Sequence, residues 1–170
     1  MVGQIHKAVV RELRNLGEER GYITTQFRMK LGSPDVVWSI DLKDVRNEKG
    51  QRVFRQIRKP MRVPIAVFEV CYSEGQKAIR GSFKLLDSIP AAFKGFVVLP
   101  ERSLKEDGEV WRAWWSEHLP NLLWKLAETH SDIAILTDAR TRWPTREPYK
   151  AFLCEPRRFR WWVDHNLFGK

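Results

Sequence analysis

The spacing of hydrophobic residues predicts that the chain begins with one helix and two strands. Apolar side chains recur every three or four positions over residues 4–19, as on one face of an amphipathic helix; they are Ile5, Val9, Leu13 and Leu16. Residues 22–29 are rich in β-branched and aromatic side chains and predict a strand. The turn Gly32-Ser33-Pro34 then leads into a second expected strand over residues 35–42.

The longest strand-like run covers residues 65–72, where Glu69 interrupts an otherwise apolar sequence. Such a run is typical of a central strand that is buried on both faces. Four further elements are expected after it: a helix over residues 76–89, a strand over 96–99, a Trp-rich helical region over 111–130 that is kinked or divided at Pro120, and a strand over 133–137. Helices and strands in this order predict an α/β fold with a mixed sheet flanked by helices.

Length and composition place this pattern in one soluble domain spanning residues 1–170. Uncharged stretches are much shorter than the ~20 apolar residues that a bilayer span needs, and residues 1–20 alternate charge with hydrophobe, unlike a signal peptide. We therefore expect a cytoplasmic protein with no membrane partner. Cys71 and Cys154 are too few for a disulfide framework, and the four scattered histidines are interpreted as ordinary surface or partly buried side chains.

The net charge of +9 is concentrated in two segments. Residues 43–62 carry eight basic and two acidic side chains, and residues 140–170 carry eight basic and three acidic ones. The first segment is expected to be an exposed hairpin or long loop, and its turn is predicted at residues 47–50. Basic patches of this kind favour nucleic acid, with DNA as the expected partner and RNA as an alternative. The candidate binding residues are Arg52, Arg55, Arg58, Lys59, Arg62, Arg157, Arg158 and Arg160.

Two carboxylates lie within or beside apolar strands, where a charge needs a physical reason. Asp35 opens one predicted strand directly after a turn, and Glu69 lies inside another. If these strands pair as antiparallel neighbours through the basic segment, the two side chains converge, and Glu12 on the first helix can reach the same point. Clustered carboxylates in an apolar cleft need a counter-charge, which a hard divalent cation such as Mg²⁺ supplies.

These residues resemble the PD-(D/E)xK phosphodiesterases, the restriction-endonuclease-like superfamily. The resemblance rests on Pro34-Asp35, on Phe68-Glu69-Val70, on the helix after that strand and on the opening helix with Glu12. It implies an αβββαβ core over about residues 1–100, followed by a Trp- and Arg-rich C-terminal extension over about 101–170. It also implies a nuclease dependent on Mg²⁺ or Mn²⁺, with Asp35 and Glu69 as metal ligands and Glu12 as a third catalytic carboxylate. Nucleases of this type often pair to cut both strands of a duplex, so a homodimer is an alternative to the monomer.

The sequence departs from the family at Cys71, where the motif has a lysine. Lys77 is the nearest substitute, although the helical pattern places it away from the apolar stripe. The loss of the lysine favours a second reading, in which the nuclease fold has lost catalysis and serves as a nucleic-acid-binding or assembly module. Further alternatives are Asp35 as a turn cap, Glu69 as the partner of an arginine such as Arg28, and Asp41 as a competing metal ligand.

Overall fold

A computed structural model describes residues 2–25, 32–72, 75–99, 118–137 and 150–151. In this part of the chain, three α-helices and one short 3-10 helix accompany a single five-stranded sheet. The helices are α1 (Val2–Glu19), η1 (Leu42–Asp44), α2 (Gln76–Asp87) and α4 (Leu119–Thr129). The strands are β1 (Val36–Asp41), β2 (Arg62–Tyr72), β3 (Phe93–Leu99), β4 (Ile133–Thr137) and β5 (Lys150–Ala151).

The sheet is mixed, and its strands follow one another in chain order. β1 and β2 are antiparallel, whereas β2–β3, β3–β4 and β4–β5 are parallel pairs. The β1–β2 register shifts between Trp38 and Ser39, where the partner changes from Ala66 to Pro64. This bulge accommodates a proline, which has no N–H to give to a ladder. β2 thus lies between two neighbours, as predicted for the apolar run.

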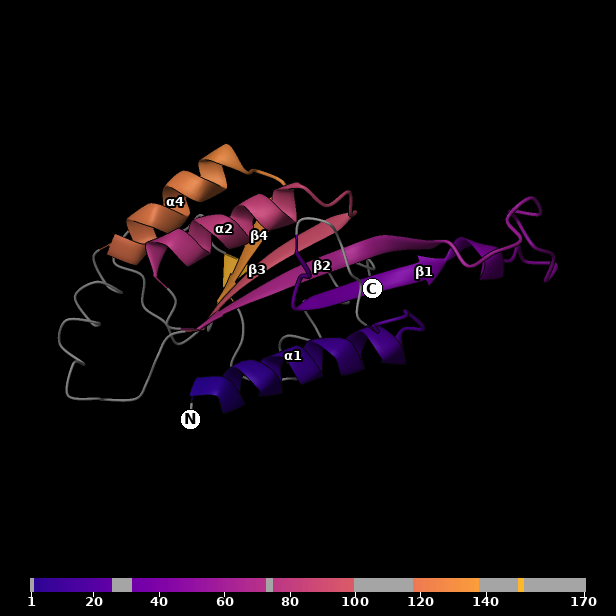
Figure 1. The fold of residues 1–170 in the computed structure, drawn as a ribbon, viewed down its shortest axis with the longest axis horizontal. Coiled ribbons are helices and arrows are strands. Elements are labelled where there is room, and N and C mark those ends of the chain that lie inside the picture. The colour runs from indigo at the N-terminus through magenta and orange to yellow at the C-terminus, as the bar shows by residue number, and fades with distance from the viewer. Residues whose placement is uncertain (1, 26–31, 73–74, 100–117, 138–149, 152–170) are drawn as a thin grey trace.

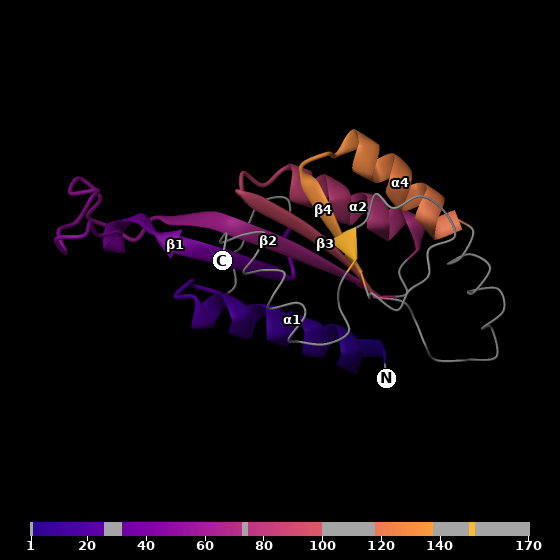
Figure 2. The same ribbon diagram turned by 180° about the vertical axis from the view of Figure 1, so that it is seen from behind.

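Helix α1 covers one face of the sheet, and α2 and α4 cover the other (Figures 1 and 2). The α1 face is built around Trp38, which packs at a tilt against Phe68 and stacks on Tyr22. Its indole N–H donates to the carbonyl of Leu13 at 2.9 Å. A buried indole therefore has its one donor satisfied and fixes the position of α1 on the sheet.

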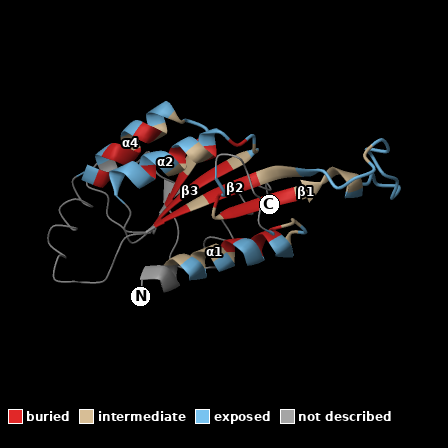
Figure 3. Cartoon of the chain, viewed as in Figure 1, coloured by how far each residue is buried: buried red, intermediate tan, exposed pale blue. Residues whose placement is uncertain are grey.

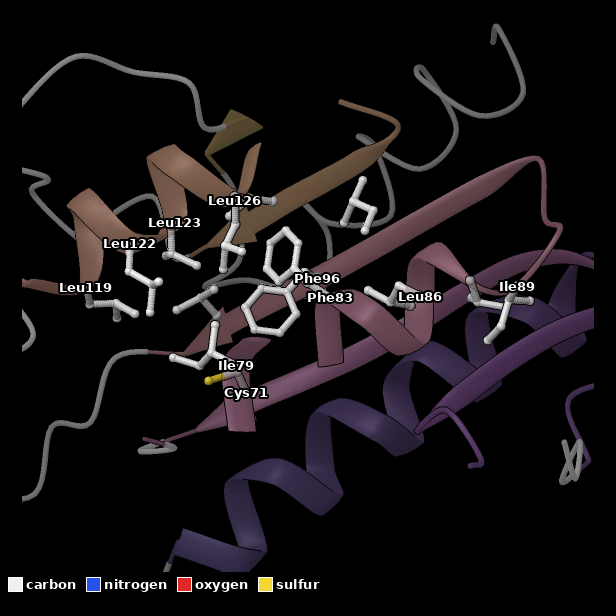
Figure 4. Close-up of a cluster of buried hydrophobic side chains, with 14 of the residues drawn as sticks. Cys71, Ile79, Phe83, Leu86, Ile89, Phe96, Leu119, Leu122, Leu123 and Leu126 are labelled. Atoms are coloured by element: carbon white, nitrogen blue, oxygen red, sulfur yellow. The ribbon is translucent and has the colours of Figure 1, made fainter. Parts of the chain in front are cut away.

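The opposite face forms a second apolar cluster in which strands and both helices interlock (Figure 4). Phe83 of α2 packs against Phe96 of β3 with ring centroids 4.7 Å apart. Leu119 and Leu123 of α4 are completely buried in the same cluster. The hydrophobic core therefore continues beyond residue 100, into the region that the sequence assigned to an extension.

Residues 43–62, which we call the basic arm, connect β1 to β2 and project beyond the end of both strands (Figure 1). Most of its residues are exposed (Figure 3). An isolated bridge joins Arg46 to Arg52 around a turn, and Gly50 in that turn has a φ of 73°, a conformation that favours glycine. The predicted exposed loop with a turn at residues 47–50 is confirmed.

The predicted elements that fall in the described residues are confirmed within three residues of their expected ends, apart from the segment discussed next. Of the Trp-rich region, residues 111–117 lie outside the described residues, and Pro120 lies in the first turn of α4. The strand expected over residues 22–29 is not confirmed in its described part, 22–25, where an isolated bridge joins Ile23 to Ser39. The physical reason is that this segment is tied to α1, because Tyr22 N–H donates to Gly17 O at 3.0 Å and the Thr24 hydroxyl donates to Glu18. No helix in the described part of the chain has both the length and the apolar character needed to cross a bilayer.

Candidate active site

The structure brings Asp35 and Glu69 together across the β1–β2 pair. The register pairs Val36 with Phe68, so the next position of this antiparallel ladder places Asp35 opposite Glu69. The backbone N–H of Asp35 donates to Glu69 Oε1 at 3.2 Å, and the backbone N–H of Val70 donates to Asp35 Oδ2 at 2.8 Å. Strand pairing thus brings the two residues together at the beginning of β1, and each carboxylate accepts from a backbone N–H of the opposite strand.

Glu69 lies half-buried on the face of β2 that α2 covers. The Ser82 hydroxyl of α2 donates to Glu69 Oε2 at 3.0 Å. Both carboxylate oxygens of Glu69 therefore accept a hydrogen bond, one from the beginning of β1 and one from α2. Each bond limits the rotation of the carboxylate, so Glu69 is held in one orientation between two elements.

Helix α1 reaches Asp35 through two side chains that the sequence analysis did not select. His6 Nε2 lies 3.3 Å from Asp35 Oδ2, and Arg14 Nη2 donates to the Asp35 carbonyl at 3.3 Å. His6 precedes Val9 and Val10 on the helix by three and four residues, and therefore lies on the same face, toward the sheet. This spacing is the signal in the sequence that could have singled out His6, which was interpreted as an ordinary surface or partly buried side chain; the structure gives it intermediate exposure.

A hollow of about 200 Å³ opens beside Asp35 and is lined mainly by polar groups. The lining residues are Arg14, Thr24, Thr25, Ser33, Pro34, Asp35 and Val37. A water molecule needs roughly 10–15 Å³ of such space, so this hollow admits several waters or a small anionic group. Asp35 thus borders a polar hollow with one guanidinium in its wall.

The structure does not bring the other two predicted catalytic residues, Glu12 and Lys77, into the contacts described for Asp35 and Glu69. Glu12 is half-buried on α1, and among the described residues Asp35 receives its α1 contacts from His6 and Arg14 rather than from Glu12. Lys77 is exposed in the first turn of α2, where it makes no hydrogen bond or ion pair with the described residues. Glu12 and Lys77 stay predictions as catalytic residues.

Cys71 is 1% exposed and belongs to the apolar cluster under α2, beside Ile79 (Figure 4). It shares a sheet face with Glu69, as the alternation along the strand predicts. Its surroundings are those of a core residue, because the side chains packed around it are apolar. The position where the family has a lysine is therefore filled by a buried thiol.

Asp41, the competing ligand, lies at the other end of β1 and anchors the basic arm. Its Oδ1 accepts from the backbone N–H of Met61 at 2.9 Å and from that of Lys43 at 3.0 Å. The hydrogen bond from Met61 lowers the pKa of Asp41; burial opposes this shift, and Lys43 and Arg62 add to it. Asp41 thus joins the two ends of the arm and is separated from Asp35 by the length of the strand.

The candidate nucleic-acid ligands are distributed over the arm. Arg52, Arg55, Arg58 and Lys59 are exposed, and Arg62 at the beginning of β2 donates to the Thr25 hydroxyl at 2.7 Å. Arg157, Arg158 and Arg160, like Arg28, lie outside the described residues. The first basic patch is therefore placed on a projecting segment.

The described residues contain no group of three or more His, Cys, Asp or Glu side chains arranged to hold a metal ion. The Asp35–Glu69 pair nevertheless has the oxygen donors that Mg²⁺ prefers, and Mg²⁺ is commonly bound through one or two carboxylates while it keeps several waters. The residues present therefore fit a divalent cation that is completed by water and by substrate.

Comparison with known proteins adds no evidence about function, so the functional proposal rests on the residues described above. The chain matches no protein-family model, no curated protein and no solved structure.

Proposed function

We propose that this chain is a metal-dependent nuclease of the restriction-endonuclease-like superfamily that hydrolyses phosphodiester bonds in DNA. The observation that carries the proposal is the meeting of Asp35 and Glu69 at the beginning of β1, with the Asp35 N–H 3.2 Å from Glu69 Oε1. These two carboxylates are the proposed ligands of Mg²⁺ or Mn²⁺. When bound, such an ion activates water and offsets the negative charge that develops on the phosphate.

The neighbouring residues of the chain position the ligands. The Val70 N–H and His6 hold the Asp35 carboxylate, and Ser82 holds that of Glu69. Arg14 lines the hollow beside Asp35, where its guanidinium suits a phosphate oxygen. We assign to Arg14 the positive charge that the family places two residues after the glutamate, because Cys71 cannot supply it.

The basic arm supplies the proposed DNA contacts. Residues 43–62 carry eight basic and two acidic side chains, a net charge of +6, and most of them are exposed. Exposed cations attract the phosphate backbone whatever its sequence, so binding through the arm is expected to weaken steeply as salt is added.

A second candidate function is DNA binding or assembly without catalysis. The burial of Cys71 in the apolar cluster favours it, because a side chain at that position points into the core. The two candidates differ in one measurable property, which is cleavage in the presence of a divalent cation.

The test is cleavage of plasmid and branched DNA with Mg²⁺ or Mn²⁺ by the wild-type protein, Asp35→Ala and Glu69→Ala. Cleavage is expected from the wild type and a loss of more than about 100-fold in each variant, because each removes a proposed metal ligand. Salt-sensitive DNA binding, measured on the same samples, is expected to stay within about twofold of the wild type.

The matched control is Asp44→Asn, which removes an exposed carboxylate at η1. It is expected to cleave as the wild type does. Wild-type protein that binds DNA and leaves it intact with both metals would contradict the nuclease proposal and favour the binding module.

A further inference from the structure

The basic arm carries apolar side chains on its surface as well as charge. Among the described residues, the exposed large hydrophobic side chains are Val53, Phe54 and Met61, which are 50%, 37% and 52% exposed. All of them lie in the arm, although it makes up a minor part of the described chain. Single exposed hydrophobics are ordinary, whereas their confinement to one projecting segment points to a contact surface.

The arm presents these side chains from a hydrogen-bonded loop. Asn47 Oδ1 accepts from the N–H groups of Lys49 and Gln51 at 3.1 and 2.9 Å, and the Val53 N–H donates to Val45 O at 3.0 Å. Asp41 ties the end of the arm to its beginning. Because these bonds already order the loop, binding through it costs less conformational entropy than folding a free segment would.

Cations flank the apolar pair directly in the sequence, in the order Arg52-Val53-Phe54-Arg55. A partner that fits must offer closely spaced negative charges beside apolar, flat surfaces, and nucleic acid offers both in its phosphates and its bases. Proteins that bend duplex DNA insert apolar side chains of this kind between base steps while cations hold the phosphates. Binding to a lipid surface commonly uses an amphipathic helix, whereas the described arm has only the three-residue η1.

We infer that the arm inserts Val53 and Phe54 as a wedge between base pairs of duplex DNA, with Arg52 and Arg55 on the adjacent phosphates. The inference rests on the proposed function and adds its mode of binding. The carboxylate pair and the beginning of the arm lie at opposite ends of β1, and Asp41 follows Asp35 by six residues. At ~3.3 Å per residue this is roughly 20 Å, or about six base pairs, so the wedge contacts DNA at least that far from the cleaved bond.

The experiment measures binding of a fluorescein-labelled duplex by anisotropy over a range of KCl concentrations, with EDTA present. In Val53→Ser/Phe54→Ser we expect about tenfold weaker binding at every salt concentration and an unchanged slope of log K against log salt, because stacking is lost and charge is kept. Arg52→Gln/Arg55→Gln/Arg58→Gln is expected to reduce that slope by about 2.7, which is 0.9 for each of three phosphate contacts. Gln56→Ser, an exposed uncharged residue of the arm, is the matched control and should bind as the wild type does.

A duplex containing 2-aminopurine reports unstacking. Its fluorescence should rise when wild-type protein binds and stay low with Val53→Ser/Phe54→Ser at saturating concentration. If Val53→Ser/Phe54→Ser binds the duplex as tightly as the wild type and raises the fluorescence equally, the wedge is overturned. A second measurement uses anionic lipid vesicles: if the wild type binds them and the variant does not, the apolar pair serves a lipid surface and the wedge is overturned as well. Because EDTA removes divalent cations, the outcome is independent of whether the protein cleaves DNA.

Discussion

Two aspartates on one strand illustrate how hydrogen-bond donors decide the role of a residue. Asp35 and Asp41 stand at opposite ends of β1, and the sequence offers both as metal ligands. Asp41 accepts from two backbone N–H groups that close the basic arm, so its oxygen is used in structure. Asp35 meets Glu69 and borders a polar hollow. The fold determines which N–H groups donate to each carboxylate. For this reason the sequence alone could not decide between Asp35 and Asp41 as the metal ligand.

The contact between α1 and the sheet gives a residue-scale prediction at Gly17. A Cβ added there would lie 2.6 Å from Trp38 Cδ1 and Nε1 and 2.8 Å from Thr24 Cγ2. We expect Gly17→Ala to lower the free energy of unfolding by about 1–3 kcal/mol, because the buried indole must move and its bond to Leu13 O is strained. Urea unfolding followed by tryptophan fluorescence measures this change.

Gly81 is the matched control, since it is also a helical glycine and a Cβ there would meet nothing within 4 Å. Gly81→Ala is expected to raise the free energy of unfolding by about 0.5–1 kcal/mol through the higher helix propensity of alanine. Equal effects of the two substitutions would show that Trp38 does not restrict position 17.

Local hydrophobic patterns predicted most of the helices and strands, whereas contacts between elements could not be predicted from them. The approach of Asp35 to Glu69 was expected on the condition that their strands pair as antiparallel neighbours through the basic segment, and the structure shows this pairing. The contribution of His6 and Arg14 could not, since it depends on how α1 lies across the sheet, which Trp38 and Gly17 determine through packing. Residues 22–25 were predicted to form a strand from their residue types, but hydrogen bonds to α1 hold them in another conformation.

A buried lysine links β3 to the turn before β4, and this contact predicts an effect on stability. Lys94 Nζ donates to Asp132 Oδ2 at 2.6 Å and to Asp87 O at 3.2 Å, and its side chain is 10% exposed against 54% for Asp132. Asp132→Asn should lower the free energy of unfolding at neutral pH by about 1–2 kcal/mol, because it leaves the buried ammonium without its counter-charge. Lys94→Met should cost less, since the half-exposed Asp132 regains water.

The same pair predicts a pH dependence. The hydrogen bond from Lys94 lowers the pKa of Asp132 below its usual value of 3.8. The stabilisation is therefore complete above pH 3.8 and disappears as the pH falls through the lowered pKa. The difference in the free energy of unfolding between the wild type and Asp132→Asn, measured by urea unfolding, should become smaller in acid. A gap that is constant from neutral to acid pH would contradict the ion pair.

In the whole molecule, the β1–β2 ladder places the two proposed sites apart. One end holds the carboxylate pair beside α1 and α2, and the other end carries the basic arm out from the sheet (Figure 1). The sequence predicted both parts and left their separation undetermined, because that distance is set by the length and pairing of two strands. If the proposed function holds, we expect from this separation that cleavage and DNA binding can be impaired independently of each other.

A metal site at Asp35 and Glu69 is tested by calorimetric titration with Mn²⁺ and Mg²⁺ of the wild-type protein, Asp35→Ala, Glu69→Ala and Asp41→Asn. Asp41→Asn is the matched control, because it changes an aspartate of the same strand and keeps an acceptor oxygen for the arm. We expect the wild type and Asp41→Asn to bind the metal and Asp35→Ala and Glu69→Ala to lose it. Binding that survives in Asp35→Ala and Glu69→Ala, or that is absent from the wild type, would contradict a metal site at the carboxylate pair.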